Sequence, residues 1–146
     1  VPTSAQVVSV KPSQMLTLTS YGGGGQCGVN AIGKTLVTVQ KSDGTFAPFT
    51  IPANKVFVVT GLDWTQGNTG APNKAETLFL HSLTSNGVIW PIVIAHSGGS
   101  DDSRAGGHMP VSGVAFKAGD TICYSVNTGN IGSAIALVHG YLAAKR

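Results

Sequence analysis

The side chains that could carry acid–base or metal chemistry are few and widely spaced. No two histidines stand in the His-x-x-x-His or His-x-His spacing of metal sites, and no Gly-x-Ser-x-Gly nucleophile motif occurs. The histidines are His81, His96, His108 and His139, and the acids are Asp43, Asp63, Glu76, Asp101, Asp102 and Asp120. The sequence therefore predicts no catalytic residues, no metal site and no enzyme activity, with a grouping of His96 and His108 across one loop as the alternative.

The most polar segment is the loop from Ser97 to Gly107, which is followed directly by His108. It contains Asp101, Asp102 and Arg104, and binding residues concentrate on such loops above a rigid scaffold. These side chains, with His108, are predicted to bind a ligand such as sugar hydroxyls. Calcium bound through the carboxylates is a weaker alternative, because the EF-hand pattern is missing, so no cofactor is expected. A solvated connector is the third interpretation.

A second candidate site follows Trp64, where the loop Gln66–Asn73 contains Asn68 and Asn73. An aromatic ring can cover the apolar face of a sugar while amides bond its hydroxyls, so Trp64, Asn68 and Asn73 are predicted ligand-binding residues. The alternative is that Trp64 belongs to the core, as a tryptophan between hydrophobic strand residues usually does.

Charge excludes one class of partner. Charged residues make up 10% of the chain, against about 25% in an ordinary soluble domain. The net charge is +3, but the basic residues are scattered, and only Lys145 and Arg146 are adjacent. Because nucleic-acid binding needs a clustered basic patch, no nucleic-acid partner is predicted. No apolar stretch approaches the roughly 20 residues of a membrane span.

The two cysteines, Cys27 and Cys123, are far apart in the sequence. We expect them to form one disulfide, and two buried free thiols are the alternative.

The chain begins Val1-Pro2-Thr3-Ser4, which is similar to a mature end left after removal of a signal peptide. Together with the low charge, these features predict a secreted or cell-surface protein.

Short runs of β-forming residues alternate with clusters of Gly, Pro, Asn and Ser along the whole chain. No window combines helical periodicity with capping residues. The predicted strands are Gln6–Val10, Met15–Tyr21, Thr35–Lys41, Phe46–Ile51, Val56–Trp64, Glu76–Ser82, Val88–Ala95, Met109–Phe116, Thr121–Val126 and Ala134–Ala143. The sequence thus predicts one all-β domain over residues 1–146: a two-sheet antiparallel sandwich of about eight to ten strands without substantial helix. Residues 1–12 are expected to form an extended N-terminal segment.

Two dipeptides have strong turn chemistry, Asp43-Gly44 and Asn86-Gly87, and each predicts a hairpin between the strands that flank it. Proline cannot donate to a sheet ladder, so Pro48 and Pro91 are predicted at sheet edges or strand ends.

Two runs are apolar on both faces, residues 55–62 and 134–142. In the second run the small residues Ala134 and Ala136 lie on one face, and the large residues Ile135, Leu137 and Tyr141 lie on the other. Such strands are covered on both sides. The second cover is either an adjacent subunit, which predicts a homo-oligomer, or the domain's own second layer.

The last third of the chain resembles C1q-like and tumour-necrosis-factor-like jelly rolls. The segment Phe116–Ile122 (FKAGDTI) is similar to their Gly-Asp step into a hydrophobic strand, and Val138–Leu142 (VHGYL) is similar to their closing strand. The resemblance implies a jelly-roll sandwich whose final strand lies near the axis of a tight trimer.

We therefore predict a secreted, non-enzymatic, homotrimeric binding module that recognises carbohydrate or a cell-surface partner through its loops. The alternative is a structural protein, a self-assembling subunit of an extracellular filament, coat or capsid-like shell.

Overall fold

The computed structural model describes residues 9–19, 34–68, 76–83, 89–97, 104–126 and 131–145. Strands make up most of this part, and every strand pair is antiparallel. The only helix in the described ranges is one 3-10 turn, η1 (Pro12–Gln14). The predicted all-β class without substantial helix is confirmed.

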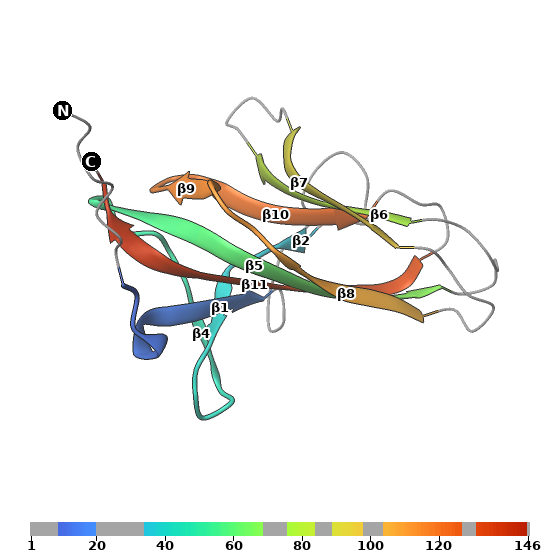
Figure 1. Ribbon diagram of the computed structural model, residues 1–146, viewed down its shortest axis with the longest axis horizontal. Coiled ribbons are helices and arrows are strands. Elements are labelled where there is room, and N and C mark those ends of the chain that lie inside the picture. Colours follow the sequence, from blue (N-terminus) through green and yellow to red (C-terminus); the bar gives the residue numbers. More distant parts are fainter. Residues whose placement is uncertain are drawn as a thin grey trace.

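The described strands form two sheets (Figure 1). The seven-stranded sheet contains β1 (Met15–Thr19), β3 (Thr38–Gln40), β4 (Phe46–Pro48), β5 (Lys55–Asn68), β8 (Arg104–Pro110), β9 (Ala115–Lys117) and β11 (Ile131–Ala144). Its order is β4-β3-β1-β11-β5-β8, and β9 also pairs with β5. The four-stranded sheet contains β2 (Lys34–Thr35), β6 (Glu76–Leu83), β7 (Ile89–Ser97) and β10 (Thr121–Val126), in the order β2-β10-β6-β7.

Two predicted strands are divided in the structure. The run 35–41 divides because the chain crosses between the sheets: the Leu36 amide bonds to Ile122 of β10, whereas the Val37 carbonyl accepts from Phe49. The run 109–116 divides into β8 and β9 around Gly113, whose φ of +77° belongs to a turn. Of the predicted strand 6–10, residues 6–8 lie outside the described ranges.

Turn chemistry and proline positions agree with the sequence. Asp43 accepts hydrogen bonds from the Thr45 amide and hydroxyl, and Gly44 has a φ of +82°, between the paired strands β3 and β4. Strands β6 and β7 pair as the Asn86-Gly87 turn predicts, although the turn itself lies outside the described residues. Pro48 and Pro91 lie in β4 and β7, which end their respective strand orders.

One hydrophobic cluster contains residues of both sheets. Leu18, Leu62 and Val138 come from the centre of the larger sheet, and Ile122 and Tyr124 come from β10. The cluster also contains Leu36, Phe57, Val59, Trp64, Phe116 and Ala136. These residues alternate along β1, β5 and β11 with residues on the opposite side of the larger sheet, because successive side chains of a strand point to opposite faces.

We call this opposite side of the larger sheet the outer face. Cross-strand pairing places its residues in rows across the sheet: Thr17 stands opposite His139, and Asp63 stands opposite both Leu137 and His108. The described side chains of the outer face that matter below are Met15, Thr17, Phe46, Asp63, His108, Ile135, Leu137, His139 and Tyr141.

Candidate functional site

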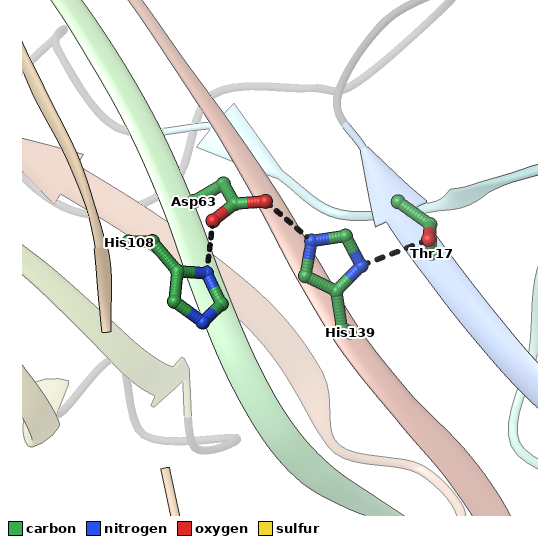
Figure 2. Close-up of polar contacts among 4 residues, drawn as sticks. All are labelled: Thr17, Asp63, His108 and His139. Carbon is green, nitrogen blue, oxygen red and sulfur yellow. Dashed lines mark hydrogen bonds and ion pairs between the residues drawn. The ribbon is translucent and has the colours of Figure 1, made fainter. Parts of the chain in front are cut away.

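Four polar side chains on the outer face form a continuous chain of hydrogen bonds. Thr17 comes from β1, His139 from β11, Asp63 from β5 and His108 from β8, and these strands are neighbours in that order. Figure 2 shows the Asp63 carboxylate between the two imidazole rings, with Thr17 on the far side of His139. We call these four residues the Asp63 cluster.

The contacts of the Asp63 cluster fix most of its hydrogen positions. Asp63 Oδ2 lies 2.8 Å from His139 Nε2, and Oδ1 contacts His108 Nδ1. An ionised carboxylate can only accept hydrogen bonds, so both of these ring nitrogens carry a proton. A neutral His139 then has an unprotonated Nδ1, which accepts the hydroxyl proton of Thr17 over 2.9 Å.

Gly61 provides the space in which the two rings meet the carboxylate. A Cβ atom at this position would lie 3.3 Å from Cε1 of His108 and 3.8 Å from Cδ2 of His139. Gly61 is the cross-strand partner of His139 and is two residues from Asp63. The absence of a side chain here lets both imidazoles lean over β5.

The two histidines stabilise the ionised form of Asp63. Hydrogen bonds from His139 and then from His108 hold the pKa of Asp63 below its ordinary value, and partial burial of the carboxylate opposes this effect only in part. The net charge of the cluster is therefore −1 when both rings are neutral, zero when one ring is protonated, and +1 when both are protonated.

Thr17, His139 and Asp63 have the order of a nucleophile, a base and an orienting acid. Acyl transfer also needs free backbone N–H groups to stabilise an oxyanion. Thr17, however, lies in β1, which is paired on both sides with β3 and β11, so the neighbouring amides belong to the sheet ladder. Within the described ranges, no group of three or more His, Cys, Asp or Glu side chains is arranged so that it could hold a metal ion. The cluster is suited to holding protons.

The structure places Trp64 in the hydrophobic core, with 9% of its surface exposed. A Cβ at Gly107 of β8 would lie 2.7 Å from the Trp64 ring, so the ring packs directly over that glycine. This is the core position that the sequence left open as the alternative, and an enclosed ring offers no face to a sugar. Its buried Nε1 has no hydrogen-bond partner among the residues that the structure describes.

The structure describes the remaining predicted binding residues only in part. His108 lies exposed in β8, bonded to Asp63. Asn68 ends β5 and Arg104 begins β8, and their side chains are outside the described part of the chain. Three others, Asn73, Asp101 and Asp102, lie wholly outside the described residues.

Cys123 is fully buried in β10. Cys27, its expected disulfide partner, lies outside the described residues, so the disulfide stays a prediction.

Sequence reasoning missed Thr17, Asp63 and His139 as site residues. Two features of the sequence could have indicated these residues. Asp63 is the single acid in an otherwise apolar predicted strand, and His139 is the single imidazole between Leu137 and Tyr141 on one strand face. Each is unremarkable alone, and only the pairing register of β1, β11, β5 and β8 shows that they meet.

Comparisons with protein-family models and with curated proteins find no match for this chain. Among the residues described, no helix has the length and apolar character needed to cross a bilayer. The strand pairing and the outer face are therefore the features that bear on function.

Proposed function

We propose that this chain is a secreted, non-enzymatic jelly-roll domain that assembles with further copies of itself, as a trimer or a larger structural array, through the outer face of its seven-stranded sheet. The observation that carries the proposal is the distribution of exposed apolar side chains. All three large hydrophobic residues that are exposed in the described part, Met15, Phe46 and Ile135, lie on the outer face.

The pairing of strands supports the jelly roll. Strand β1 pairs with β11, β2 with β10, β5 with β8, and β6 with β7. When these strands are taken in chain order, the first pairs with the last, the second with the second to last, and so inward. A chain folded back on itself in this way and divided between two sheets is the jelly-roll arrangement.

The outer face has the composition of an interface core. Ile135 is 50% exposed, Met15 and Phe46 are each 39% exposed, and Leu137 and Tyr141 lie half-buried between them. Exposed hydrophobic residues are ordinary when they are scattered, but a group on one face marks an interaction site. The one carboxylate among the described residues of this face is bonded to two imidazoles, and interface cores are depleted of free charges.

A second copy fits this face better than an oppositely charged partner. Among its described side chains, the face offers no run of like charges that would select a partner of opposite sign. Around a symmetry axis close to β11, the apolar side chains of one copy meet the same side chains of the next, so the surface is its own complement. Recognition of carbohydrate by Asn73, Asp101, Asp102 and the other loop residues stays a prediction.

The test measures the native mass of the whole chain by light scattering and analytical ultracentrifugation. We expect a discrete or open-ended oligomer for the wild type, and dissociation for Ile135→Lys and Met15→Lys, because each buries a charge at the contact. Ala53→Lys, in the exposed turn that precedes β5, is the matched control and should assemble normally. A wild type that stays monomeric at every concentration, or charge variants that assemble as the control does, would refute the proposal.

A further inference from the structure

We infer that assembly through the outer face takes up protons at the Asp63 cluster, so that the oligomer tightens as the pH falls from about 8 to about 6. The inference rests on the proposed self-association and adds its regulation. It follows from where the cluster lies and from how its charge depends on the two imidazoles.

The cluster occupies the middle of the outer face and is open to water in the single chain. The side chain of His108 is 63% exposed, that of Asp63 39%, and that of His139 27%. Leu137 stands directly opposite Asp63 in the ladder, and Ile135 follows on the same strand face. A copy that covers these apolar residues therefore also removes water from the carboxylate and its two rings.

Burial favours the neutral form of the cluster. Removing a net charge from water costs several kcal/mol unless the charge is compensated. With two neutral rings each copy brings one negative charge to the contact, and copies related by symmetry bring these charges close together. One added proton per cluster turns Asp63 and a histidine into an ion pair with no net charge. A second proton makes the cluster positive and again opposes burial.

The Thr17 hydroxyl can hydrogen-bond to His139 in both the neutral and the protonated state of the ring. When Nδ1 is unprotonated, the Thr17 hydroxyl donates to it, and when Nδ1 carries a proton, the same oxygen accepts from it. His139 can thus change its charge without breaking the contact of 2.9 Å, and the Asp63 cluster keeps its geometry while it titrates.

Among the described side chains, the other ionisable groups near the outer face are neither imidazoles nor carboxylates. Tyr141 lies two residues from His139 on β11, and Lys117 of β9 stands opposite Val56 at one end of the face. Strands β1, β3 and β4 contribute Met15, Thr17, Gln40 and Phe46, none of which titrates. The side chain of Arg104, at the start of β8, is outside the described part of the chain.

The acids of the two described turns are engaged away from the cluster. Asp43 accepts from Thr45 in the hairpin between β3 and β4, and Asp120 accepts from the Lys117 amide beyond β9. Among the described side chains of this face, His108 and His139 are therefore the groups that can accept the proton that assembly takes up.

The experiment measures the dissociation constant of the full chain by sedimentation at several pH values from about 8 to about 5. One proton taken up per copy tightens association by up to about tenfold per copy for each pH unit, which lowers the dissociation constant up to about 100-fold for a dimer and about 1000-fold for a trimer. We expect wild-type association to strengthen toward pH 6 and to weaken again once both rings are charged.

Asp63→Asn should invert this dependence, because its cluster is neutral when both rings are neutral and positive after one protonation. An asparagine keeps one acceptor and gains a donor, so the rings can retain their hydrogen bonds by a change of tautomer. Thermal unfolding at each pH verifies that the variant is folded. His108→Gln is a second variant: it removes one titrating ring, so its association should strengthen toward low pH without the later weakening.

Asp43→Asn is the matched control, since it removes a similarly bonded carboxylate in a turn and should keep the wild-type profile. Association that is independent of pH, or an Asp63→Asn profile that matches the wild type, overturns the inference and leaves the proposed function standing. A chain that does not associate at any pH overturns both.

Discussion

Replacing Gly140 with alanine tests how closely β11 and β5 approach each other. A Cβ at position 140 would lie 2.2 Å from the backbone oxygen of Val58 and 2.7 Å from Cζ of Phe57. Contacts below 3.0 Å essentially never occur for real Cβ atoms, so the carbonyl would have to move by about 0.8 Å. The nearest obstacle is backbone in the centre of the larger sheet, where the register shifts between His139 and Gly140, and no rotamer change relieves it.

Overpacking of this kind costs about 1–3 kcal/mol, and the lower entropy of an unfolded chain with alanine returns about 0.4–1 kcal/mol. We therefore expect Gly140→Ala to lose about 1–2 kcal/mol, which corresponds to roughly 3–7 °C in the unfolding midpoint of a domain of this length. Chemical and thermal denaturation followed by circular dichroism measure this loss.

Gly61→Ala is the control for the Gly140 prediction. Its Cβ would meet Cε1 of His108 at 3.3 Å, the end of an exposed side chain that can turn away, so its effect should be small, below about 1 kcal/mol. Equal losses for both variants, or a stable Gly140→Ala chain, would show that the close approach of the two strands is not a constraint on the fold.

Three further predictions concern other parts of the structure. Because the pKa of Asp63 is lowered in the folded state, the ionised carboxylate stabilises the fold at pH values above its ordinary pKa of 3.8, and this contribution is lost as the pH falls through the folded-state pKa. Between about pH 5 and 2 the urea midpoint of the wild type should therefore fall more than that of Asp63→Asn. Gly107→Ala places a Cβ 2.7 Å from the Trp64 ring, so it should lower the unfolding midpoint by several degrees and alter tryptophan fluorescence, and an unchanged spectrum would contradict the packing. If Cys27 and Cys123 are joined, the denatured, unreduced chain should react with no thiol reagent, and reduction should cost about 4–5 kcal/mol of stability.

The fold class could be predicted because it depends on local patterns. The strand Thr121–Val126, the turn at Asp43-Gly44 and the edge position of Pro48 are all confirmed by the structure. Strand ends were less predictable. The division at Leu36–Val37 arises because β2 pairs with β10 in one sheet while β3 pairs with β1 in the other, and neither pairing can be read from the local sequence.

The candidate site could not be predicted for a related reason. Thr17, Asp63, His108 and His139 are separated by tens of residues, and no spacing along the chain links them. Their contacts follow from cross-strand register, in which a shift of one residue would move each side chain to the core face. The loops, by contrast, were predicted to bind a ligand because they are polar, although Trp64 beside one of them packs into the core.

The position of β11 has a consequence for how the chain reaches its native state. β11 lies between β1 and β5 in the middle of the larger sheet, and Thr17 contacts a residue 122 positions later. During synthesis on the ribosome one edge of β1 therefore stays unpaired until residues 131–144 have been synthesised and have left the ribosome. Such distant pairing slows folding and favours encounters between nascent chains. We therefore expect folding of this domain to be a late, all-or-none event and its rate to depend sensitively on substitutions in β11.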